Sequence, residues 1–148
     1  MSSSPRETKR RGALLAKRIL GRHGAKPLII ALHGELGAGK TTFVQGLAKG
    51  LGVKQSVTSP TFLIMRHHTP RGGSIRHFFH IDAYRIKNSK EVAAIGIRDV
   101  FSTPRSVVVI EWPEHLHIKL PRGTMRVKLH HGPRESERIL TISPTYLQ

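Results

Sequence analysis

A buried strand, a glycine-rich loop and a helix follow one another early in the chain, and this order limits the fold more than any other feature. Residues 28–32 form a short run without a polar side chain, as in a strand that is covered on both faces. The glycine-rich sequence Gly34–Thr41 follows at once, and residues 41–51 are typical of a helix that ends at Gly50 and Gly52. We therefore expect an α/β domain with the loop at the carboxyl end of a central strand.

The loop matches the pattern G-x-x-x-x-G-K-[ST]. Its glycines allow consecutive backbone N–H groups to point at phosphate oxygens, and the following helix directs its positive end at the same anion. In this pattern Lys40 reaches the β- and γ-phosphates, and the Thr41 hydroxyl is a ligand of Mg²⁺. The sequence predicts that ATP and Mg²⁺ bind here; a strand-to-helix turn without a ligand is the alternative. The loop residues expected to contact the nucleotide are Glu35, Leu36, Gly37, Ala38, Gly39, Lys40, Thr41 and Thr42.

Acids at the ends of other strands are candidates for the metal and for catalysis. Glu111 ends the apolar run 107–110, where it could hold Mg²⁺ directly or through water, or be only an exposed glutamate. Asp82 could orient the attacking water or only cap the next turn, and we expect His80 to pack beside Asp82 and orient it. Thr61 lies in a loop that could sense the γ-phosphate, or it is only a turn residue. The expected catalytic residues are Lys40, Asp82 and Glu111.

The rest of the chain predicts one domain, residues 8–148, after a disordered tail of residues 1–7. An amphipathic helix is expected over residues 8–22. Two further strand pairs complete the central sheet: a hairpin over residues 61–67 and 74–81, and a closing antiparallel pair over residues 124–130 and 138–142. The expected fold is a three-layer α/β domain like that of the P-loop NTPases, with a central sheet of mixed parallel and antiparallel strands.

The chain is strongly basic, with 25 Lys and Arg against 9 Asp and Glu and a net charge of +16. This charge suits a polyanion such as nucleic acid, or it reflects only compositional bias. The basic clusters are Arg6, Lys9, Arg10, Arg11, Lys17 and Arg18 in the first helix, and Arg122, Arg126 and Lys128 near the closing strands. Without cysteines, a signal-peptide-like apolar segment or an apolar run of roughly 18 residues, a cytoplasmic protein without a membrane partner is expected.

Five segments together resemble the TsaE family, also called YjeE, over nearly the whole chain. The similarity rests on the Ser-Pro-Thr, His-x-Asp-x-Tyr-Arg and Glu-Trp-Pro elements in addition to the glycine-rich loop. The matching segments are Gly34–Thr42, Val57–Phe62, His80–Arg85, Gly96–Asp99 and Glu111–Glu114.

The resemblance implies an ATPase that serves the threonylcarbamoyladenosine modification of tRNAs reading codons that start with A. It implies that Thr41 and Glu111 ligate Mg²⁺ and that Lys40 and the loop backbone hold the phosphates of ATP. It further implies that Asp82 matters for hydrolysis, that Trp112 lies close to the nucleotide, and that Thr8 lies near the base. The implied partners are the threonylcarbamoyl transferase subunit and its paralogous scaffold partner, with tRNA bound directly or through that complex.

Three other functions compete with this interpretation. A small P-loop kinase needs an acceptor pocket and a mobile arginine-bearing lid, and no insertion is long enough to supply one. A GTPase switch is disfavoured because the chain has no Asn-Lys-x-Asp motif. A nucleic-acid-binding module with a vestigial loop is disfavoured because Lys40, Thr41 and Glu111 are all present.

Overall fold

A six-stranded sheet in the order β2-β3-β4-β1-β5-β6 forms the centre of the computed structural model, which describes residues 1–22, 24–58, 60 and 63–143. Neighbouring strands among β3, β4, β1 and β5 run parallel, whereas β2 and β6 pair antiparallel at the edges. The predicted mixed sheet is therefore confirmed. The strands are β1 (Leu28–Gly34), β2 (Met65–His68), β3 (His77–Asp82), β4 (Ser106–Glu111), β5 (Met125–His131) and β6 (Arg138–Ser143).

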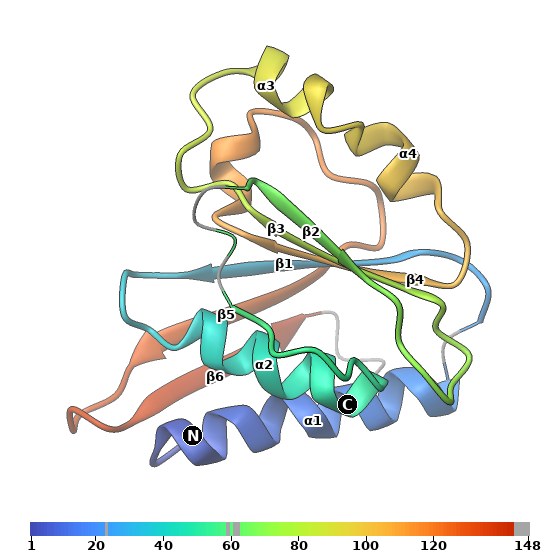
Figure 1. The fold of residues 1–148 in the computed structure, drawn as a ribbon. Coiled ribbons are helices and arrows are strands. Elements are labelled where there is room, and N and C mark those ends of the chain that lie inside the picture. Colours follow the sequence, from blue (N-terminus) through green and yellow to red (C-terminus); the bar gives the residue numbers. More distant parts are fainter. Residues whose placement is uncertain (23, 59, 61–62, 144–148) are drawn as a thin grey trace.

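Helices cover both faces of the sheet, which gives the three layers that the sequence predicts (Figure 1). One face carries α1 (Pro5–Arg22) and α2 (Lys40–Leu51), which lie side by side. The other face carries α3 (Ser89–Ala94), α4 (Ile97–Ser102) and the short 3-10 helix η1 (Pro113–Leu116). No helix in the described part of the chain is long and apolar enough to cross a membrane.

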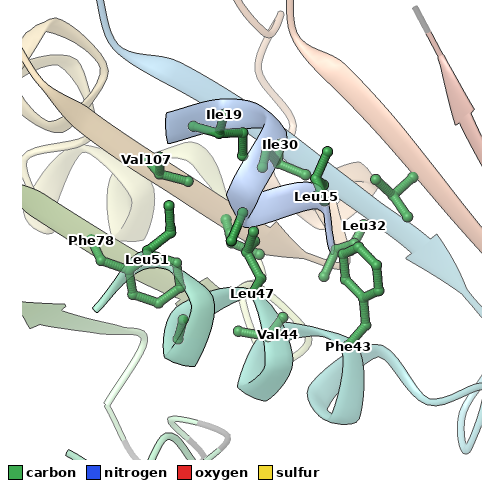
Figure 2. Close-up of a cluster of buried hydrophobic side chains, with 14 of the residues drawn as sticks. Leu15, Ile19, Ile30, Leu32, Phe43, Val44, Leu47, Leu51, Phe78 and Val107 are labelled. Carbon is green, nitrogen blue, oxygen red and sulfur yellow. The ribbon is translucent and has the colours of Figure 1, made fainter. Parts of the chain in front are cut away.

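The larger core lies between the sheet and the α1–α2 layer. Figure 2 shows Leu15 and Ile19 of α1 and Leu47 of α2 packed toward Ile30 and Val107 of the central strands. Successive strand residues alternate between this core and the one beneath α3 and α4, so both faces of β1 and β4 are buried. This double burial explains why these strands are continuous apolar runs in the sequence.

Glycines bring α1 and α2 into backbone contact. A Cβ atom added at Gly46 would overlap the carbonyl oxygen of Lys9, and one added at Gly12 would overlap that of Phe43. A Cβ at Gly50 would come within 2.6 Å of the Cβ of Ala16. The absence of side chains at these positions lets the two helices approach closely.

The N-terminal residues differ from the expected disordered tail. The chain forms helix α1 from Pro5 onward, and Ser2 and Arg138 exchange two backbone hydrogen bonds of 2.7 Å beside β6. The Ser4 hydroxyl accepts a bond from the backbone of Glu7, as an N-cap does before a proline at the first helical position. The prediction of a tail was wrong because this local cap, and a strand partner more than a hundred residues away, were overlooked.

Candidate functional site

A cavity of about 600 Å³ opens where the glycine-rich loop leaves β1, at the carboxyl end of the parallel strands. Ligands of open α/β sheets commonly bind at this edge. The lining residues come from the loop and the start of α2, from Pro60 and Ile64, and from the ends of β3 and β4 and the residues that follow them. They are Leu36, Gly37, Ala38, Gly39, Lys40, Thr41, Thr42, Pro60, Ile64, Asp82, Tyr84, Arg85, Glu111 and Trp112.

The loop presents the amino end of α2 to this cavity. Gly37 and Gly39 have positive φ angles of 76° and 95°, a conformation that L side chains rarely adopt. Gly39 is also the N-cap residue and supplies no side-chain cap, so the first N–H groups of α2 have no partner of that kind. An uncapped helix of 12 residues with its positive end at a cavity suits an anionic ligand.

Lys40 lies against the loop that precedes it. Its Nζ donates to the carbonyl oxygens of Gly34 at 2.7 Å and of Glu35 at 3.0 Å, and lies 4.2 Å from the centre of the Trp112 ring. Burial lowers the pKa of Lys40, and the nearby carboxylates, Glu111 first, act in the opposite direction. The ammonium group is thus held at the cavity wall by loop carbonyls, in a place where an anion would compete for it.

Glu111 connects the loop to the sheet. Its Oε1 accepts a hydrogen bond of 3.2 Å from the Thr41 hydroxyl, and its Oε2 bonds to Nε2 of His80 at 2.6 Å. His80 and Glu111 are both buried. The expectation that His80 orients Asp82 was wrong: the register of β3 and β4 places Asp82 opposite Glu111, and the imidazole two residues earlier reaches the Glu111 carboxylate instead.

Asp82 lies at the end of β3 and lines the same cavity. Its Oδ1 accepts a hydrogen bond of 3.0 Å from the backbone of Tyr84, so the turn-capping role considered for it is present. The Asp82 carboxylate also acts on Lys40, where it favours the charged ammonium. Two carboxylates on neighbouring strands therefore face the glycine-rich loop.

Three aromatic rings form one wall beside Lys40. Trp112 has a φ of 58°, and its ring lies 5.1 Å from that of Tyr84 and 5.4 Å from that of His115. His115 bonds through Nδ1 to the carbonyl oxygen of Tyr84 at 2.8 Å. A strained, non-glycine backbone that is held in place by its neighbours is characteristic of functional positions.

The side-chain oxygen atoms of Thr41 and Glu111 in this cavity fit Mg²⁺. The Thr41 hydroxyl and the Glu111 carboxylate already lie within hydrogen-bonding distance of each other, so one small cation could bind between the two oxygen atoms once the hydroxyl, keeping its proton, turns its lone pair toward it. Mg²⁺ prefers such hard oxygen ligands and commonly keeps several waters beside one or two protein groups. The second Glu111 oxygen is held by His80, which leaves Oε1 directed at Thr41.

The cavity brings together most of the residues that the sequence singles out. Of the loop residues, Glu35 does not line it and contributes a carbonyl oxygen to Lys40. Thr8 lies behind the loop: its hydroxyl bonds to Ser2 and Ser4, and its methyl carbon is 3.6 Å from where a Gly39 Cβ would lie. Thr61 lies outside the residues that the structure describes.

Some residues at the site were not among the expected site residues, and Pro60 and Ile64 of the lining are two of them. Tyr84 lines the cavity, and its place in the His-x-Asp-x-Tyr-Arg segment could have indicated it. Arg85 of the same segment, the one candidate for an arginine finger in the sequence, also lines the cavity. Arg138 of β6 donates to the carbonyl oxygen of Gly37 at 3.2 Å and to two carbonyls of its own hairpin. No local pattern marks Arg138, because its contact with the loop depends on how the distant hairpin folds back.

Known proteins resemble this chain along most of its length. TsaE of Haemophilus influenzae is 36% identical over 118 residues, which cover 80% of this chain and 72% of that protein. TsaE of Streptomyces coelicolor is 43% identical over 116 residues, covering 76% and 77%. Both are named tRNA threonylcarbamoyladenosine biosynthesis proteins. A crystal structure of YdiB from Bacillus subtilis superimposes with a TM-score of 0.69 at 26% identity, over 94% of this chain and 80% of that one.

The family model described as "Threonylcarbamoyl adenosine biosynthesis protein TsaE" matches residues 2–140. This match includes the glycine-rich loop, both carboxylates and the aromatic wall of the cavity. The chain therefore belongs to the TsaE family of tRNA threonylcarbamoyladenosine biosynthesis proteins.

Proposed function

We propose that the chain binds Mg·ATP in the cavity at the glycine-rich loop and hydrolyses it in support of threonylcarbamoyladenosine modification of tRNA. The observation that carries this proposal is the 3.2 Å contact between Thr41 at the start of α2 and Glu111 at the end of β4. It joins the two oxygen ligands that Mg²⁺ needs beside a phosphate-binding loop. The membership of the chain in the TsaE family supports the tRNA pathway.

The groups of the site have separate tasks in this proposal. The uncapped amino end of α2 and the Lys40 ammonium hold the phosphates, and Trp112 shields Lys40 from water on one side. Thr41 and Glu111 hold Mg²⁺, which, when bound, offsets the charge that develops on the phosphates. Asp82, one strand away and in the same cavity, orients the attacking water.

The isolated chain is expected to hydrolyse ATP slowly. A phosphoryl transfer is accelerated by a positive group that reaches the transferred phosphate, and among the described lining residues Arg85 is the only arginine. We therefore propose that the threonylcarbamoyl transferase subunit and its paralogous scaffold partner complete the site, and that hydrolysis drives or resets their complex. The cytoplasm, where tRNA is modified, is the proposed location.

The decisive experiment measures ATP hydrolysis by the purified chain, alone and with the transferase pair. We expect turnover below about 1 s⁻¹ alone, and a marked increase with the partners. Lys40→Ala should abolish nucleotide binding while the far-ultraviolet circular dichroism spectrum stays unchanged, because Lys40 contacts loop carbonyls and a ring at the cavity wall. Wild-type affinity and turnover in Lys40→Ala would contradict the assignment, and a phosphorylated acceptor in place of free phosphate would indicate a kinase.

A further inference from the structure

A second cavity, of about 470 Å³, lies along α2 and shares no lining residue with the first. Three lysines from three separate segments line it: Lys9 of α1, Lys49 of α2, and Lys54 in the loop that follows α2. We call this cavity the lysine groove. Gln45 of α2 and residues 52–57 form the rest of its wall.

The lysine groove is built on fixed backbone. The contact between Gly46 and the carbonyl of Lys9 sets the position of α1 beside Gln45 and Lys49. The side-chain amide of Gln45 donates to the carbonyl oxygen of Val57 at 3.0 Å, which holds the 52–57 loop against α2. The backbone segments that carry the three lysines are therefore held in position without a ligand.

The charge of the groove is not balanced within the protein. No Asp or Glu is among the described residues that line it, and none of its three lysines forms an ion pair within the described ranges. Lys49, in the last turn of α2, has a favourable interaction with the helix dipole. Lys9 and Lys54 have no such compensation, since Lys9 lies toward the amino end of α1 and Lys54 lies in a loop.

The positive surface extends from the groove along α1. Arg6, Arg10 and Lys17 are exposed and, at spacings of four and seven residues, share the face of α1 next to Lys9. Glu7, the acid of this helix, already bonds to Ser3 and Arg11. With 18 residues, α1 is about 27 Å long, a length that an extended polyanion can follow and a single small anion cannot.

We propose that the lysine groove, together with this basic face of α1, binds the phosphodiester backbone of RNA. Two observations favour RNA over an acidic protein surface. The apolar residues of the groove, Val53 and Val57, are buried, whereas protein interfaces depend on exposed apolar or aromatic anchors. Aromatic residues are missing from its described lining, so the groove contacts backbone phosphates without reading bases. The choice of RNA as the polyanion rests on the proposed role in tRNA modification.

The test compares two variants with the same change in net charge. The groove variant combines Lys9→Gln, Lys49→Gln and Lys54→Gln. The control variant combines Lys87→Gln, Lys90→Gln and Lys119→Gln, which remove three exposed lysines around α3 and η1, on the opposite face of the sheet. Binding of a fluorescein-labelled tRNA transcript is followed by anisotropy at several salt concentrations, with thermal unfolding as a check on the fold.

We expect the wild-type protein to bind the transcript, with affinity that falls steeply as salt rises, because each neutralised phosphate releases counterions. The groove variant should lose at least tenfold in affinity at low salt. The slope of its log affinity against log salt concentration should become shallower by about 2 to 3 units. The control variant should lose less than about threefold, and both should bind ATP like the wild type, which separates this test from the ATPase proposal. Equal losses in the two variants, no RNA binding at low salt, or equally tight binding of inorganic tripolyphosphate would overturn the proposal.

Discussion

His80 donates a hydrogen bond of 2.6 Å from Nε2 to Oε2 of Glu111, and neither side chain is accessible to solvent to any useful extent. The bond joins neighbouring parallel strands, so the pairing of β3 with β4 sets the orientation of the carboxylate. Because Oε2 is occupied, Oε1 is the oxygen that faces Thr41. His80 is thus a positioning residue that acts through Glu111.

Replacing His80 should weaken the affinity of the site for Mg²⁺. His80→Leu removes the donor and leaves a buried carboxylate oxygen without a partner, whereas His80→Gln keeps a donor. Loss of such an outer partner commonly costs roughly 10- to 100-fold in metal affinity or activity. We expect His80→Leu to raise the Mg²⁺ concentration required for half-maximal binding of a fluorescent ATP analogue by about tenfold, with partial rescue in His80→Gln.

His68→Gln provides a matched control, because His68 on the adjacent strand β2 also has a buried ring nitrogen but makes no bond to Glu111. It should leave the Mg²⁺ titration unchanged. If His80→Leu and His80→Gln lose activity equally, with no change in Mg²⁺ dependence, the role of His80 is only structural.

Thr41 and Glu111 should act as one unit in catalysis. Each single alanine substitution removes part of the same proposed metal shell, so the second substitution has little left to remove. We expect Thr41→Ala and Glu111→Ala each to reduce Mg²⁺-dependent turnover by at least tenfold, and the double variant to be scarcely slower than the worse single one. A double-mutant cycle measures the coupling, and additive effects would place the two residues in separate sites.

The contact between α1 and α2 predicts opposite effects for two glycine substitutions. Gly46→Ala places a methyl group onto the carbonyl oxygen of Lys9, and both atoms belong to packed helices that must separate. We expect it to lower the free energy of unfolding by about 2 kcal/mol or more, as overpacking does. Gly21→Ala meets no atom within 4 Å and should raise stability by about 0.5 kcal/mol through helix propensity. Urea unfolding of both variants tests the pair, and equal behaviour would contradict the close approach.

Much of the fold is predictable from sequence because its determinants are local. The apolar run 28–32, the glycine-rich loop and the helix after it each depend on neighbouring residues, and they occur as β1, the loop and α2. The same holds for the hairpin of β2 and β3 and for Asn88, whose side chain caps α3 by accepting from Lys90 and Glu91.

Contacts between distant segments could not be predicted in this way. The backbone bonds between Ser2 and Arg138 hold residues that look like a tail in the sequence. Arg138 also contacts Gly37 of the glycine-rich loop, which lies about a hundred residues away in the chain. The partner of His80 was misassigned because a strand pattern shows which face a side chain takes but not which strand lies beside it. The lysine groove likewise exists only because α1 and the 52–57 loop meet on α2.

The start of α1 should contribute a pH-dependent part of the stability through Glu7. Its carboxylate accepts bonds from the backbone N–H of Ser3 at 2.8 Å and from the Ser3 hydroxyl at 2.7 Å, and these bonds lower the pKa of Glu7 from 4.5 to about 2. Because the folded state favours the ionised form, this stabilisation is complete above the unfolded pKa near 4.5 and is lost as the pH falls through about 2. Glu7→Gln should therefore lower the melting temperature at pH 7, and the difference from wild type should shrink steadily as the pH falls from about 4.5 toward 2. Thermal unfolding across this range measures it, and Glu135→Gln, at an exposed position before β6, controls for the loss of one negative charge. A difference that stays constant down to pH 2 would show that the Ser3 bonds do not favour the ionised carboxylate.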